Sequence, residues 1–151
     1  MAKYASFREL IAWQKGMDLA EKVYHATRSF PSADLFTVGT QLRRAANSIP
    51  ANVSEGFSRR SQGVYRSHVA IALGSQAEVQ THLELCRRLS LISSSAVQEL
   101  ESLADEVGRL LFGLWRSLLV STVCYSLALV TLFLGAGPWA VRYLLSLSLG
   151  A

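Results

Sequence analysis

The chain has 151 residues, of which half are hydrophobic and 17% are charged, and its net charge is +4. This length suffices for one domain with a buried core, and the mild positive charge is compatible with nucleic acid or anionic lipid without identifying either. The amino terminus lacks a signal-peptide pattern and two cysteines are too few for a disulfide framework, so we expect a cytoplasmic protein.

The first predicted helix covers residues 7–28, where apolar side chains recur at spacings of three and four. Ser6 and Glu9 have the spacing of a capping box at its start, and Pro31 follows its end. The positions that we expect to face the core are Leu10, Trp13, Met17, Ala20, Val23 and Tyr24, with Ile11 and Leu19 widening that face.

A second helix is predicted over residues 33–55, and Pro50 lies inside it. Proline lacks a backbone donor and clashes with the preceding turn, so we expect this helix to kink or break there. Its apolar face comprises Leu35, Val38, Leu42, Ala45, Ala46 and Ile49.

Two further helices are predicted, one over residues 61–89 and one from Ala96 onward, where Ser95 and Gln98 form a second capping-box pattern. The middle of the third helix is rich in small residues, which allow close packing of neighbouring helices. Four amphipathic helices joined by short links predict an all-α fold, an antiparallel up-down-up-down four-helix bundle over residues 1–118.

Residues 119–151 form an apolar tail, predicted to extend the bundle as a helix, and no charged residue occurs between Ser117 and Val141. About 20 apolar residues can span a bilayer, so residues 118–141 are a candidate membrane contact. The same run could instead be an oligomer-facing extension of the fourth helix, or an accidental extension produced by read-through. We favour the anchor, because soluble surfaces seldom carry so long an uncharged run.

The sequence contains no phosphate-binding loop, nucleophile motif or metalloprotease motif. His68 and His82 share a helical face but lie roughly 21 Å apart along the axis, too far to bind one ion. His25 belongs to another helix, and we interpret all three histidines as partly buried or interface residues. We therefore expect no enzymatic activity, no metal and no cofactor.

Arginines in the second and third helices are the strongest functional signal. Their guanidinium groups suit phosphate oxygens, and grouped on one face they would make a salt-sensitive nucleic-acid surface. They could equally be solvated rims or partners in intersubunit ion pairs. The candidate nucleic-acid-binding residues are Arg43, Arg44, Arg59, Arg60, Arg66, Arg87 and Arg88.

Several separate segments carry a family resemblance: residues 7–15, 41–56, 59–61 and 71–75. Together they resemble the bacterial four-helix-bundle proteins encoded in 23S rRNA intervening sequences, also called S23 ribosomal proteins. The sequence also resembles the related accessory variability determinant of diversity-generating retroelements. The likeness covers about residues 7–118.

This resemblance implies a ring-like homopentamer with a basic surface. For the retroelement relatives it further implies binding to RNA or DNA and to a reverse transcriptase, whereas the role of the intervening-sequence proteins is not settled. Two features depart from the family pattern. Thr37-Val38-Gly39 suggests a looser start of the second helix, and the tail after Leu118 has no counterpart in typical members. The alternative that we keep is a membrane-anchored protein–protein assembly module without nucleic-acid binding.

Overall fold

A computed structural model describes the backbone of residues 4–133 and the exposure of side chains through residue 119. The chain divides into two compact units, Met1–Trp115 and Arg116–Ala151, and each is considered by itself. The predicted domains, residues 1–118 and 119–151, remain predictions.

Helices account for nearly all of the described chain, which confirms the all-α prediction. Short links connect them, so each helix follows closely on the one before. In chain order the elements are the 3-10 helix η1 (Phe7–Glu9), α1 (Ile11–Ala26), α2 (Ser32–Asp34), the π-helix η2 (Leu35–Gly39), α3 (Thr40–Ser58), α4 (Gln62–Arg88) and α5 (Ser94–Phe133).

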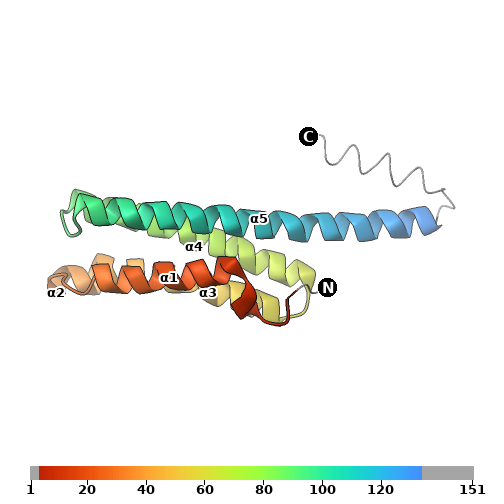
Figure 1. Cartoon of the computed structure of the whole chain (residues 1–151), viewed down its shortest axis with the longest axis horizontal. Coiled ribbons are helices and arrows are strands. Elements are labelled where there is room, and N and C mark those ends of the chain that lie inside the picture. The colour runs from red at the N-terminus through yellow and green to blue at the C-terminus, as the bar shows by residue number, and fades with distance from the viewer. Residues whose placement is uncertain (1–3, 134–151) are drawn as a thin grey trace. The chain divides into compact units, whose positions relative to one another are not determined.

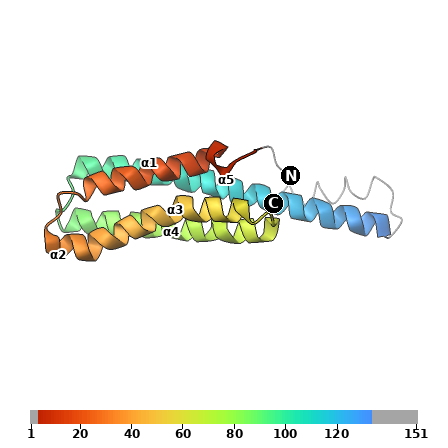
Figure 2. The same cartoon turned by 90° about the horizontal axis from the view of Figure 1, so that it is seen from below.

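In the unit Met1–Trp115, α1, α3, α4 and the first half of α5 lie side by side as a four-helix bundle (Figures 1 and 2). Contacts between α1 and α3 and between α3 and α4 pair early residues of one helix with late residues of the next. For example, Ser75 bonds Ser48 while His68 contacts Asn52. Lys15 and Lys22 of α1 pair with Glu106 and Glu99 of α5 in the same reversed order. Neighbouring helices are therefore antiparallel.

The first predicted helix is correct in place, and its predicted inward residues Leu10, Leu19, Ala20 and Val23 are buried, whereas three others are exposed. Ser6 caps η1 by accepting from the Arg8 amide, and Leu10 in extended backbone separates η1 from α1. Ile11, Met17 and Tyr24, predicted to face the core, are 58%, 44% and 45% exposed. The buried residues of α1 are Ala12, Gly16, Leu19, Ala20 and Val23.

The second predicted helix begins irregularly and continues through its proline. Its start is the π-helix η2, where the Thr40 hydroxyl donates to the Leu35 carbonyl at 2.8 Å. α3 does not end at Pro50, because proline disturbs only the bond to the preceding turn while the rest of the helix stays paired. A Cβ added at Gly16 of α1 would lie 3.2 Å from Ile49 Cγ2 and 3.5 Å from the Pro50 ring, so the glycine lets α1 pack closely against Ile49 of α3.

The closest approach of α3 and α4 occurs at Gly56. A Cβ at this position would lie 2.7 Å from His68 Cβ and 2.8 Å from the Tyr65 ring, shorter than real side chains tolerate. α5 begins at Ser94, and its cap is Ser93 rather than the predicted Ser95, because the Ser93 hydroxyl oxygen accepts from the Ala96 amide at 3.4 Å.

α5 continues through Phe133. Among the helices that the structure describes, none combines the length and the apolar character needed to cross a membrane. The membrane contact predicted for residues 118–141 falls largely on residues whose side chains, or whose backbone, lie outside the described part.

Candidate arginine surface on the α3–α4 pair

Charge is distributed unequally between the two halves of the bundle. Residues 40–88, which span α3, its link and α4, contain seven arginines and three glutamates, a net charge of +4. α1 and the part of α5 up to residue 115 contain three basic and six acidic residues, a net charge of −3. An anionic ligand is therefore attracted to the α3–α4 half.

We call the end of the bundle where α3 passes into α4 the link end, and it carries Arg59, Arg60 and Arg66. The Arg59 side chain donates to the Glu55 carboxylate at 2.7 Å, and this hydrogen bond lowers the pKa of Glu55. Arg60 has left-handed backbone with φ of 53°, its side chain is exposed, and it has no polar partner among the described residues. Arg60 is thus free to bind a phosphate.

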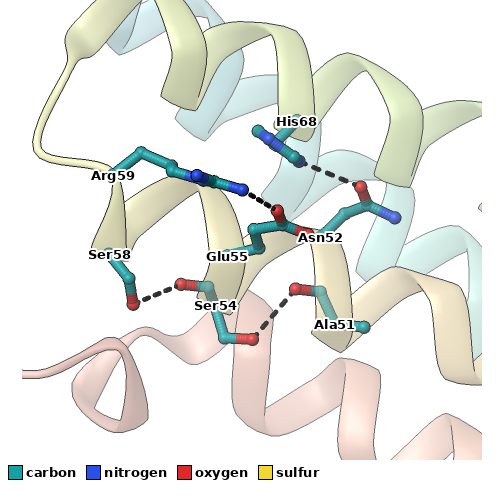
Figure 3. Close-up of polar contacts among 7 residues, drawn as sticks. All are labelled: Ala51, Asn52, Ser54, Glu55, Ser58, Arg59 and His68. Atoms are coloured by element: carbon teal, nitrogen blue, oxygen red, sulfur yellow. Dashed lines mark hydrogen bonds and ion pairs between the residues drawn. The ribbon is translucent and has the colours of Figure 1, made fainter.

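Figure 3 shows the hydrogen bond from Arg59 to Glu55 and the contact of His68 with Asn52, and further polar contacts join the middle of the α3–α4 pair. The Asn52 amide donates to the Ser48 carbonyl at 2.8 Å, and its oxygen lies 3.2 Å from His68 Nδ1. Ser75 then donates to the Ser48 hydroxyl at 2.8 Å. The half-buried His68 side chain therefore joins α4 to α3, in agreement with its prediction as an interface residue.

Arg66 lies on the side of α4 that faces α5. Its guanidinium carbon is 4.9 Å from the centroid of the Trp115 ring, a cation–π contact. The contact holds the positive charge beside an aromatic surface and leaves the guanidinium without a carboxylate partner among the described residues.

The opposite end of α4, which we call the turn end, holds Arg87 and Arg88. Arg87 donates to both oxygens of Glu84, at 2.6 and 2.8 Å, and Arg88 donates to one of them at 2.7 Å. The hydrogen bond from Arg87 and then that from Arg88 lower the pKa of Glu84 to about 2. One carboxylate thus partly neutralises both arginines.

Arg43 and Arg44 differ although they are adjacent on α3. Arg43 Nε donates to the Thr27 hydroxyl at 2.7 Å, and its guanidinium carbon lies 4.8 Å from the Tyr24 ring centroid. Arg44 is exposed and has no polar partner among the described residues. Arg43 therefore links α3 to the end of α1, whereas the Arg44 side chain is accessible to a ligand.

The seven predicted arginines do not form one compact patch. Arg66 and Arg87 are separated by about 32 Å along α4, and Arg44 and Arg59 by about 22 Å along α3. The structure brings Arg59, Arg60 and Arg66 together at the link end. Arg87 and Arg88 lie at the turn end, as a separate pair.

The other candidate groups show no chemistry of their own. Among the residues that the structure describes, no three histidine, cysteine or acidic side chains gather as ligands for a metal ion. His25 is exposed and lies 3.7 Å from Glu21, and His82 is half-buried on α4. Cys86 is fully buried, and burial, followed by the charge of Asp34, raises the pKa of its thiol to about 11.

A hollow with a volume of about 570 Å³ lies between α1 and α5, away from the arginines. Its charged lining residues pair with one another: Lys22 is bonded to Glu99, and Lys15 pairs with the neighbouring Glu106. It offers no free anion-binding group.

Sequence reasoning missed the division of these arginines into engaged and free groups. It also missed the Asn52–His68 contact and the contact between Arg66 and Trp115. The helical spacing of Glu84 with Arg87 and Arg88, three and four residues apart, was a signal that could have revealed their pairing.

Comparison with known proteins supports the fold and the family. A crystal structure at 1.70 Å of a protein with unknown function from the S23 ribosomal protein family of Bacteroides thetaiotaomicron matches with a TM-score of 0.66 and 21% identity. The match covers 70% of this chain and 96% of that one, and at this identity it establishes the fold alone. None of the curated proteins matches this chain.

The family model described as 23S rRNA-intervening sequence protein matches residues 8–113. This span includes α1, α3, α4 and the bundle part of α5, and it contains all seven candidate arginines. The likeness to the retroelement accessory protein remains a prediction. The chain belongs to the family of 23S rRNA-intervening sequence proteins.

Proposed function

We propose that this protein is a non-enzymatic, oligomeric RNA-binding protein that holds phosphates through the arginines of its link end. The observation that carries the proposal is the charge of +4 on residues 40–88, set against −3 on the other half of the bundle. Unequal charge of this kind orients an RNA toward one side of the protein and accelerates its association.

The link end suits phosphate better than the turn end does. Arg60 is unpaired among the described residues, and Arg59 uses one nitrogen on Glu55, which leaves other donors of its guanidinium for a second acceptor. At the turn end, by contrast, Glu84 competes with any phosphate for Arg87 and Arg88. Arg44 extends the basic surface along α3.

The description of the family concerns intervening sequences of 23S rRNA, so a structured RNA helix from ribosomal RNA is the ligand of first choice. A double-stranded RNA is recognised mainly through its phosphates and shape, which fits arginines without a base-reading pocket. DNA and a reverse transcriptase remain predicted partners from the resemblance.

The test compares the two arginine pairs in one protein. Wild type, Arg59→Ala with Arg60→Ala, and Arg87→Ala with Arg88→Ala would be titrated with a structured RNA at about 50 and 200 mM salt. We expect the link-end variant to lose most of its affinity for RNA. The slope of log affinity against log salt concentration should become shallower by about 1 to 2, because each lost phosphate contact contributes slightly less than 1 to this slope.

The turn-end variant removes the same number of arginines and is the matched control. Equal losses in the two variants would contradict a role specific to the link end. An affinity that does not change with salt in the wild type would overturn RNA binding through phosphates altogether.

The outward face of α4 supports the oligomeric part of the proposal. Val64, Ile71 and Leu85 recur there at multiples of seven residues, with exposed fractions of 40%, 52% and 41%. Exposed small residues lie between them, and a Cβ at Gly74 would meet no atom within 4 Å. A second helix could therefore approach this face closely and cover the aliphatic side chains.

Self-association through this face predicts that Ile71→Glu lowers the molar mass measured by light scattering during gel filtration. Phe36→Glu is the control, because Phe36 is also exposed, at 78%, but lies in η2. An unchanged mass for Ile71→Glu would exclude α4 as the subunit interface.

A further inference from the structure

Two aromatic rings and one arginine form a stack at the link end. Phe112 and Trp115 of α5 have ring centroids 6.0 Å apart and planes inclined by 23°, and the Arg66 guanidinium lies over the Trp115 ring. Residues three apart on a helix project from neighbouring positions, so α5 itself fixes the spacing of the two rings.

Phe112 is 54% exposed, whereas the neighbouring Leu111 is fully buried. Arg109 precedes it by three residues and is also exposed, which places a positive charge on the same side of α5. Phe112 therefore presents an aromatic surface to solvent between two arginines from different helices.

We propose that Phe112 and Trp115 form a stacking platform for an unpaired base of RNA. The inference rests on the proposed RNA binding and adds a preference for a single-stranded or unpaired segment. Arg66 and Arg109 then hold the phosphates that flank the stacked base. An aromatic surface beside positive charge is the arrangement by which proteins bind single strands without reading their sequence.

Charge favours RNA over an apolar partner at this platform. Arg66 and Arg109 flank the rings, Arg60 precedes the first residue of α4 by two positions, and the Glu55 carboxylate is already engaged by Arg59. A purely apolar partner would bury these guanidinium groups without a counter-charge, which is costly. A nucleotide offers both a ring and an anion.

The experiment uses two ligands that share phosphates and differ in bases. A fluorescent oligouridylate of about 12 nucleotides and an abasic strand of the same length would be titrated against the full chain by anisotropy at one salt concentration. We expect the wild type to bind the oligouridylate about 5- to 30-fold more tightly than the abasic strand, the effect of one stacked base.

Phe112→Ala is expected to remove this difference while leaving affinity for the abasic strand unchanged. Because Phe112 is half exposed, the variant should fold, and circular dichroism would verify this. Phe36→Ala is the matched control, since it removes another exposed phenylalanine, and it should behave as the wild type. Quenching of tryptophan fluorescence by the oligouridylate, weakened in Trp115→Leu, would give independent support.

Three results would overturn the platform. In the first, Phe112→Ala keeps the wild-type preference for the oligouridylate. In the second, the wild type binds both strands equally, which leaves phosphate binding intact and removes only the stacking. In the third, Phe112→Ala changes the oligomeric mass or the binding to anionic lipid vesicles but not the preference for bases. A wild type that binds neither strand, nor structured RNA, would instead refute the proposed function itself.

Discussion

The two ends of the α3–α4 pair contain similar arginine pairs in different environments. At the link end, Arg60 is exposed without a polar partner in the described part of the chain. Arg59 binds the Glu55 carboxylate, to which no other arginine of the described residues donates. At the turn end, Arg87 and Arg88 both bind Glu84. Identical dipeptides thus differ in the free positive charge that they offer.

The difference shows that the position of a single carboxylate decides what an arginine pair can do. A glutamate three or four residues before an arginine engages it within the same helical turn. Arg60 escapes such pairing because the residues four and three positions before it are Gly56 and Phe57, which carry no charge. Arg59, one residue earlier, has Glu55 at the required spacing and is paired with it.

The largest expected effect concerns the packing that holds the link end together. Gly56→Ala would force α3 and α4 apart, because its Cβ would lie 2.7 Å from His68 Cβ. We expect a loss of about 2 kcal/mol in the free energy of unfolding, measured by urea denaturation, and weaker RNA binding at the link end.

Gly113→Ala is the control for this substitution. A Cβ at Gly113 on α5 would meet no atom within 4 Å, and alanine is favoured over glycine in a helix by about 0.5–1 kcal/mol. We therefore expect Gly113→Ala to stabilise the protein slightly. If both variants changed the free energy of unfolding in the same direction and by a similar amount, the close packing at Gly56 would not be what holds α3 and α4 together at the link end.

A smaller effect separates the adjacent arginines of α3. Arg43→Ala should lower the free energy of unfolding by about 1–2 kcal/mol, since it removes the hydrogen bond to the buried Thr27 and the contact with Tyr24. Arg44→Ala should leave stability unchanged and weaken RNA binding. Thermal unfolding and RNA titration of both variants test this contrast, and an exchange of the two outcomes would refute the assignment of structural and ligand-binding roles.

The smallest effect is the pH dependence of the turn end. Since Arg87 and Arg88 lower the pKa of Glu84 from 4.5 to about 2, the stability from this pairing is complete above pH 4.5 and is lost as the pH falls toward 2. The difference in urea midpoint between wild type and Glu84→Gln should therefore be constant from neutral pH to about pH 5. Below that pH the difference should shrink toward zero. A difference that persists at pH 2 would mean that Glu84 stabilises the turn end without its charge.

Much of the fold follows from local pattern. The ranges of the third and fourth helices agree with the structure to within two residues at their starts, because capping serines and apolar spacing mark them. Leu19, Ala20 and Val23 of α1 are buried as the spacing predicts, but no spacing rule distinguishes Gly16 from Met17 as the inward residue. α3 continues through Pro50, where the sequence predicts a kink or break, because one proline removes a single backbone donor and the rest of the helix stays paired.

The sequence by itself determined the helical class, the short links, the family and the excess of arginine between residues 40 and 88, since these depend on composition and local spacing. Only the tertiary structure decided which arginines are free. Arg43 is engaged by Thr27 and Tyr24 of α1, and Arg66 by Trp115 of α5. Those partners lie 16 to 49 residues away along the chain, so the hydrogen bonds and ring contacts that distinguish one arginine from another form only when the helices pack.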